Sequence, residues 1–432
     1  MNNAKPSLND IAWEKLFKKY NILHAIDSQG YFEISATQIK EFREPRLMAK
    51  FDHTINLPRI FQNNKLAILP ITRGKYIISR FKAYHKFEAD DNMPITQASL
   101  PSYIQSLDCN NIPSEAVALN CAVAAGIMKD FLDDDEIIPT VSGRMGSGVF
   151  DFNIASLNIP NNVHSITVNN SQIEIDAAYE GRKSLALIEA KRDLSEDFLI
   201  RQLYYPYRVW QDRVTKTVRP IFLVYSNGIY RLYEYQFVDP NNYSSLQLIK
   251  QKNYSIEDTT ISITDIQDVL NKSSIIKEPK ISFPQADSFE RIINICELLN
   301  EQELSRNDVT ENYAFDGRQT NYYTDAARYL GLVKKRTENY TPIYKLTNQG
   351  KQILNLSFKH RQLAYCSLIL SHEVFAKILK TYLNTGIMPT KNNIIRIMKD
   401  CNLYRMKSNS TFDRRSSTIK SWINWIISLV ND

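Results

Sequence analysis

Two short apolar segments with charged ends, QIEIDA (172–177) and SLALIEAK (184–191), constrain this 432-residue chain more than any other feature. Both have the residue types of β-strands, and the glycine-containing YEGRKS between them is typical of a hairpin loop. Burying a charge is costly unless that charge is paired or used. The charged residues at the strand ends, Asp176, Glu189 and Lys191, therefore need an explanation beyond simple burial.

The spacing of these residues predicts that they meet. Side chains of a strand alternate between its faces, so Glu189 and Lys191 share one face at the end of their strand. If the two segments pair through the loop, Asp176 lies beside Glu189. Two carboxylates, completed by the Ala190 carbonyl oxygen, are ligands suited to Mg²⁺. Lys191 could then orient or help to deprotonate a water molecule and stabilise charge on phosphorus oxygens. The alternative is an ion-pair cluster at a sheet edge.

The length of the chain predicts two to four domains, because single cores rarely grow beyond about 250–300 residues. Residues 1–105 show mixed helices and short strands, an accessory region that either helps to bind a partner or is purely structural. Residues 106–275 contain the two strands with charged ends. Residues 280–357 show three amphipathic segments, a basic turn and a short strand, which is the pattern of a winged helix-turn-helix domain. Residues 358–432 repeat this pattern in part and predict a second helical, winged-helix-like domain.

The central region has a definite expected order of elements. From residue 112 to residue 240 the pattern predicts a helix, three strands, a helix and two strands, with the second helix beginning near Ser195 and kinked at Pro206. The glycine-rich GRMGSG (143–148) lacks the Gly-Lys-Ser/Thr ending of a phosphate-binding loop. We interpret it as a loop leading into the first core strand.

Asp176 with Glu189-Ala190-Lys191, on this order of elements, resembles the PD-(D/E)XK nucleases. Their pattern is an acidic residue at the end of one strand and Glu-x-Lys or Asp-x-Lys at the end of the next. The proline that usually precedes the first aspartate is replaced here by Ile175. The resemblance implies an α/β (α+β) fold with a restriction-endonuclease-like mixed sheet flanked by helices. It also implies Mg²⁺-dependent cleavage of double-stranded DNA.

Four further residues are candidates for the site or for DNA contact. The resemblance places an additional acidic ligand at Glu115 and a glutamine facing the site at Gln202. The alternatives are a glutamate favoured by the helix dipole and a solvated glutamine. Arg144 and Ser147, in the glycine-rich loop, could contact a DNA phosphate or base, or belong to a plain β-turn.

The segments after residue 280 contain side chains suited to nucleic acid. Arg, Gln and Asn read purines through two hydrogen bonds, and basic residues in a wing contact phosphates. The candidates are Arg318, Gln319, Asn321 and Tyr322 in the expected recognition helix, Lys334, Lys335 and Arg336 in the wing, and Arg414, Arg415 and Lys420 in the last segment. The alternative is a winged helix that binds protein or only packs.

Charge and composition set the class of partner. Residues 359–432 contain 12 Lys/Arg against 4 Asp/Glu, whereas the net charge of the whole chain is only +6. This basic segment indicates either a polyanionic partner such as nucleic acid or a solvated basic face. The five scattered cysteines and six histidines show no spacing typical of a metal site or disulfide framework. Without a signal-like or membrane-spanning apolar run, we expect a cytoplasmic protein. The resemblance implies that the protein is prokaryotic.

The favoured hypothesis is a type II restriction endonuclease that depends on Mg²⁺. We expect a homodimer, because two DNA strands must be cut and one chain holds one site. The resemblance also implies a functional pairing with a cognate DNA methyltransferase. Two alternatives stay open: a non-catalytic winged-helix regulator on a nuclease-like scaffold, and a repair or junction nuclease that recognises DNA structure.

Overall fold

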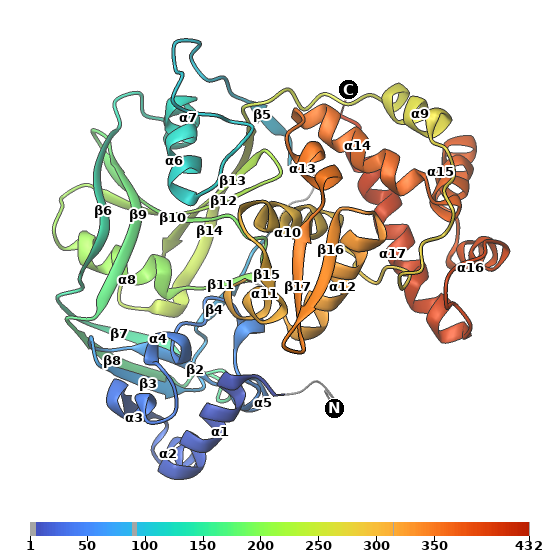
Figure 1. Cartoon of the computed structure of the whole chain (residues 1–432). Helices are drawn as coiled ribbons and strands as arrows, with labels where there is room; N and C mark the ends of the chain where they lie inside the picture. Colours follow the sequence, from blue (N-terminus) through green and yellow to red (C-terminus); the bar gives the residue numbers. More distant parts are fainter. Residues whose placement is uncertain (1–5, 89–92, 314, 432) are drawn as a thin grey trace. The chain divides into compact units, whose positions relative to one another are not determined.

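The computed structural model of the chain describes residues 6–88, 93–313 and 315–431 (Figure 1). The chain forms two compact units. The first comprises Met1–Thr96, Ser114–Tyr225 and Tyr230–Tyr254, and the second comprises Gln97–Pro113, Ser226–Ile229 and Ser255–Asp432. In the described part of the chain, no helix is long and apolar enough to cross a membrane.

The first unit begins with a small helical layer on a three-stranded sheet. Helix α1 (Leu8–Tyr20) starts at a capping box formed by Ser7 and Asp10, and it buries one apolar face. The other elements are α2 (Ile22–Gln29), β1 (Phe32–Ser35), α3 (Ala36–Lys40), α4 (Pro45–Met48), η1 (Thr54–Asn56), α5 (Arg59–Asn64), β2 (Ala67–Pro70) and β3 (Lys75–Ser79). The strands pair antiparallel in the order β1-β3-β2. The expected mixture of helices and short strands is therefore confirmed.

The larger part of the first unit is an open mixed sheet of seven strands in the order β5-β14-β13-β12-β10-β9-β6. Strand β10 (Ser184–Lys191) pairs antiparallel with β9 (Gln172–Glu180) and parallel with β12 (Thr217–Ser226). The remaining strands are β5 (Ile95–Gln97), β6 (Ile138–Gly146), β13 (Ile229–Phe237) and β14 (Leu246–Ser255). Helices α6 (Glu115–Ala124) and α8 (Arg201–Gln211) both pack on β9 and β10, and α7 (Ile127–Leu132) follows α6. A mixed α/β architecture with helices against a mixed sheet is thus confirmed.

Four local expectations were wrong or incomplete. GRMG belongs to edge strand β6, which pairs with β9, and is not a loop before the first core strand. The following strand β7 (Val149–Ala155) pairs only with β8 (Val163–Asn169), in a separate two-stranded sheet. Residues near Ser195 form no helix, because β11 (Asp197–Leu199) pairs with β4 (Tyr84–Lys86) and α8 starts only afterwards. Strand β14 lies in a polar stretch for which the sequence pattern predicted nothing.

The second unit contains the three helices and the strand hairpin that the sequence pattern predicted after residue 280. Helices α10 (Phe289–Glu301), α11 (Arg306–Asn312) and α12 (Gly317–Tyr329) are followed by the hairpin β16 (Val333–Glu338) and β17 (Thr341–Leu346). With β15 (Leu304–Ser305), the hairpin forms a three-stranded sheet in the order β15-β17-β16. Helix α12 is the third of these helices and directly precedes the hairpin, which is the order that the sequence pattern predicted.

The rest of the second unit is helical. It consists of α9 (Ile263–Lys272), α13 (Asn348–Leu354), α14 (Phe358–Leu370), α15 (Glu373–Thr385), α16 (Lys391–Asp400) and α17 (Asn409–Ser428). Between residues 358 and 431 the structure has no strand, so this segment is helical as expected but has no wing. After α16 the chain meets no partner strand, and Ser408 caps the long helix α17 directly.

Candidate active site

The two strands with charged ends pair as predicted and then separate. Register places Ile188 opposite Ala177, so Glu189 comes next to Asp176. Here Asp176 Oδ2 accepts a hydrogen bond of 2.8 Å from the Ala190 N–H, in place of a main-chain partner. Because the N–H and C=O of one strand residue point to the same side, the Ala190 carbonyl also faces Asp176. The side chains expected to converge therefore do so.

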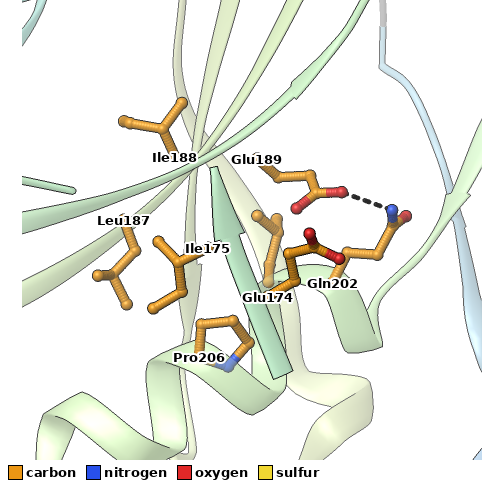
Figure 2. Close-up of a pocket in the computed structure, with 8 residues that line it drawn as sticks. Glu174, Ile175, Leu187, Ile188, Glu189, Gln202 and Pro206 are labelled. Carbon is orange, nitrogen blue, oxygen red and sulfur yellow. Dashed lines mark hydrogen bonds between the residues drawn. The ribbon is translucent and has the colours of Figure 1, made fainter. Parts of the chain in front are cut away.

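Glu189 is the centre of this cluster. Its Oε1 accepts hydrogen bonds of 2.6 Å from Lys191 Nζ and of 2.6 Å from Gln202 Nε2. Figure 2 shows Glu189 and Gln202 facing each other at a small pocket that is also lined by Ile175 and Pro206. Gln202 comes from α8, and it faces the site as the resemblance implied.

Burial gives these groups unusual proton affinities. The Glu189 side chain is only 10% exposed. Burial, opposed in part by the charge of Lys191, raises the pKa of Glu189 to about 7. Burial also lowers the pKa of Lys191, but the carboxylates around it, led by Glu189 and Glu115, outweigh burial and raise that pKa. Lys191 is therefore a cation and a hydrogen-bond donor throughout the physiological range, and not a base.

Glu115 is the first residue of α6, and its carboxylate is close enough to interact with Lys191 and Asp176. Burial raises the pKa of Glu115, and the charge of Lys191 opposes this rise. Glu115 therefore interacts electrostatically with the site. A glutamate that served only to stabilise the start of the helix would not need this interaction.

The donor set can be tested against Mg²⁺. Among the described residues, no group of three or more His, Cys, Asp or Glu side chains is arranged to hold a metal ion. The hydrogen bonds described above use Oε1 of Glu189 and Oδ2 of Asp176, which leaves one oxygen of each carboxylate. Gln202 Oε1 is buried, and nothing in the described part of the chain donates a hydrogen bond to it. Two carboxylates and an acceptor for water fit Mg²⁺, which retains several water ligands.

Sequence reasoning missed a group of residues beside this site. His53 is buried and the Asp193 side chain is 13% exposed; His53 Nε2 lies 3.4 Å from Asp193 Oδ2. Asp193 interacts electrostatically with Lys191, and Asp52 interacts with both Lys191 and Glu189. The position of Asp193, two residues after Lys191, was the only available signal. Nothing in the sequence links it to His53, which lies 140 residues earlier.

The glycine-rich segment differs from expectation. Arg144 is exposed on β6, and its Nε donates to Glu174 Oε1 of β9 at 3.2 Å. Ser147 is buried, and its Oγ accepts from the Ser171 N–H and donates to the Gly148 carbonyl. The Ser147 hydroxyl is therefore engaged within the protein, and its contact with DNA stays a prediction. Arg144 stays available at the surface.

The start of α12 contains one exposed basic side chain. Asp316 caps the helix, and Arg318 directly after it is exposed. The neighbouring polar groups are partly engaged: Gln319 Oε1 accepts from Arg291 and Asn321 Oδ1 accepts from Arg306. Tyr322 is half-buried. Arg318 is thus the strongest of the four candidates for contact with a base.

The other basic candidates also divide into exposed and engaged residues. Lys334 and Lys335 are exposed on β16, whereas Arg336 forms ion pairs with Glu303 and Glu338. On α17, Arg414 and Lys420 are exposed. Arg415 is half-buried, donates to Gln285 Oε1 at 2.6 Å, and has its pKa lowered by burial. We assign Arg415 a structural contact.

Three protein-family models match the chain in succession. They are a Domain of unknown function (DUF6996) over residues 10–78, a Domain of unknown function (DUF6997) over residues 79–255 and a Domain of unknown function (DUF7226) over residues 291–431. The second match contains the cluster around Glu189, and the third contains the winged helix. Neither a curated protein nor a solved structure matches the chain.

Proposed function

We propose that the chain is a Mg²⁺-dependent endonuclease that cleaves double-stranded DNA, of the type II restriction kind. The observation that supports this most strongly is the convergence of Asp176, Glu189 and Lys191 where β9 and β10 separate. A structural ion pair would balance its charges, whereas here Lys191 faces the carboxylates of Glu189, Glu115, Asp52 and Asp176. This excess of negative charge in a buried place favours a divalent cation.

In this proposal, Asp176 and Glu189 hold Mg²⁺ together with the Ala190 carbonyl oxygen. When bound, Mg²⁺ supplies positive charge that polarises the scissile phosphate. Lys191, which stays protonated, orients the attacking water and stabilises negative charge on the phosphate oxygens. Gln202 holds Glu189 in place through its amide N–H, and its free Oε1 accepts a hydrogen bond from water.

The second unit would supply DNA recognition. In this proposal Arg318, exposed at the start of α12, would read a base, and Lys334 and Lys335, exposed on β16, would contact phosphates. Cleavage of both strands would require two copies of the chain, so we propose a homodimer. A restriction enzyme also implies a cognate DNA methyltransferase in the same cell.

Incubation of the purified full-length protein with mixed genomic DNA, with Mg²⁺ or with a chelator, tests this proposal. Discrete fragments that form only with Mg²⁺ support sequence-specific cleavage. A smear of fragments would indicate a nuclease without sequence specificity instead of a restriction enzyme. Intact DNA, with retarded migration in a gel-shift assay, would favour a winged-helix regulator.

A further inference from the structure

A short segment at the start of η1 is hydrogen-bonded to the chain that follows strand β10. The Asp52 carbonyl accepts a hydrogen bond of 2.9 Å from the Leu199 N–H. The Asp197 carboxylate accepts hydrogen bonds from the N–H and the hydroxyl of Thr54. Between these contacts lies the buried His53 ring, which joins residues 144 positions apart in the sequence. The N-terminal part of the first unit therefore reaches the chain just beyond Lys191.

Both ring nitrogens of His53 face acceptors. Nδ1 lies 2.6 Å from the Asp197 main-chain oxygen, which can only accept, so Nδ1 must bear a proton. Nε2 lies 3.4 Å from Asp193 Oδ2. In a neutral imidazole, a protonated Nδ1 leaves Nε2 as an acceptor, which would face a carboxylate with no proton between them. The arrangement therefore requires a second proton, and the favoured species is an imidazolium facing an ionised Asp193.

The charges around His53 favour the same state. The titratable groups that face the ring are Asp193, Asp197 and Asp52, all of them acidic. Burial alone would lower the pKa of His53, but hydrogen bonding and charge from Asp193 outweigh it and raise the pKa. Conversely, although burial acts to raise it, the pKa of Asp193 is lowered by His53 and also by Lys191.

We propose that the His53 imidazolium is a positioning residue. It holds the N-terminal region against the end of β10 and neutralises the charge of Asp193. This contact is lost when the ring loses its second proton at alkaline pH. With His53 neutral, the largely buried Asp193 carboxylate loses the positive charge beside it and competes with Glu189 for Lys191. The consequence for cleavage rests on the function proposed above, whereas the protonation state of His53 does not.

The pH window follows from the direction of the two shifts. Stability from the raised His53 pKa is complete below the unfolded value of about 6.5 and is lost as pH rises through the folded value. Stability from the lowered Asp193 pKa is present above about 3.9 and is lost only in acid. We therefore expect the melting temperature of the wild type to fall as the pH rises above about 6.5.

Asp193→Asn provides the critical variant. Asparagine can donate an amide hydrogen to Nε2 of a neutral ring, while Nδ1–H still donates to the Asp197 oxygen. The contact then needs no second proton. In this variant we expect the His53 pKa to fall below about 6.5 and the alkaline loss of melting temperature attributed to His53 to disappear. His53→Gln, which cannot titrate, should also remove that loss, and exposed His24→Gln should behave like the wild type.

The experiment is a pH titration of the full-length protein, labelled with ¹⁵N-histidine and followed by NMR, in parallel with melting curves. A His53 signal that is doubly protonated at neutral pH in the wild type, and neutral in Asp193→Asn, is the expected result. A neutral His53 in the wild type at about pH 6 would overturn the proposal. If Asp193→Asn or His53→Gln folds and its melting temperature still falls at alkaline pH as in the wild type, the ion pair of His53 and Asp193 does not hold the two segments together.

Cleavage assays distinguish a failure of the His53 proposal from a failure of the proposed nuclease function. If the wild type cleaves DNA, its cleavage rate should decline at alkaline pH relative to Asp193→Asn, and identical profiles would remove His53 as a positioning residue. If no Mg²⁺-dependent cleavage occurs at all, the proposed nuclease function fails, and the NMR titration still decides the state of His53.

Discussion

Replacing Glu189 with glutamine should stabilise the folded protein at neutral and alkaline pH while it abolishes cleavage. Burial raises the pKa of Glu189 from 4.5 to about 7. Between these values the folded state binds more protons than the unfolded state, so stability falls as pH rises through this window. Glutamine resembles the protonated acid and can still accept the hydrogen bond from Lys191. It therefore avoids the cost of ionising a buried carboxylate.

The structure sets the size of this effect. A rise in pKa from 4.5 to about 7 corresponds to about 3 kcal/mol of lost stability at pH values above 7. The advantage of Glu189→Gln should be near zero below about pH 4.5 and approach about 3 kcal/mol above about pH 7. Glu234 is a matched control, because it is buried in the same sheet but holds Arg219 with both oxygens, at 2.6 and 2.7 Å. Glu234→Gln should destabilise by about 3–5 kcal/mol, since it leaves Arg219 without its charged partner.

Hydrogen exchange of peptides from β9 and β10, measured in a chelator, reports the relevant free energy. Wild type and variant are compared at the same pH, so intrinsic exchange rates cancel. Adding Mg²⁺ should then stabilise the wild type alone, because the variant lacks the carboxylate ligand. An equal loss of stability in Glu189→Gln and Glu234→Gln at pH 8 would refute the reasoning and make Glu189 an ordinary structural ion pair.

The remaining predictions concern chemistry and DNA binding. Lys191→Ala should abolish cleavage yet retain DNA binding in a gel-shift assay; cleavage near the wild-type rate would remove Lys191 from the mechanism. Asp176→Ala should eliminate cleavage and tighten metal-free binding to DNA, because it removes negative charge near phosphates; weaker binding would contradict this. Arg318→Ala should cost about 1–3 kcal/mol on cognate DNA in binding titrations and little on random DNA; equal losses would make α12 a backbone clamp. Removing Lys334 and Lys335 should weaken binding to all sequences and flatten its salt dependence; an unchanged salt slope would show that the wing does not touch phosphates.

Local pattern was sufficient to predict the pairing at the centre of the site. Strand alternation places Glu189 and Lys191 on one face, and a three-residue connection fixes the register that brings Asp176 beside Glu189. The three helices and the basic hairpin after residue 280 were likewise predictable, because their patterns are contiguous in the sequence. The hydrogen bond that Asp176 accepts from the Ala190 N–H was not visible at that level.

Contacts distant in sequence account for what the sequence could not predict. Residues after Ser195 form a strand because Asp197–Leu199 pair with β4, 111–115 residues earlier in the chain. Asp197 also accepts hydrogen bonds from Thr54, which lies 143 residues earlier. The same contacts bring His53 beside Asp193. Ser147 has a residue type suited to phosphate, but its hydroxyl is used by the Ser171 N–H in the turn after β6. Tertiary pairing thus overrode local propensity at each of these positions.

The central claim is that the cluster of Asp176, Glu189 and Lys191 hydrolyses DNA with Mg²⁺. Its most direct test is a time course of plasmid cleavage by the full-length wild type and by Asp176→Asn, each with Mg²⁺ and with a chelator. Glu180→Gln, at the far end of the same strand, is the control. The account predicts Mg²⁺-dependent cleavage by the wild type and by Glu180→Gln, and none by Asp176→Asn. Cleavage by Asp176→Asn at the wild-type rate, or no cleavage by the wild type, would contradict it.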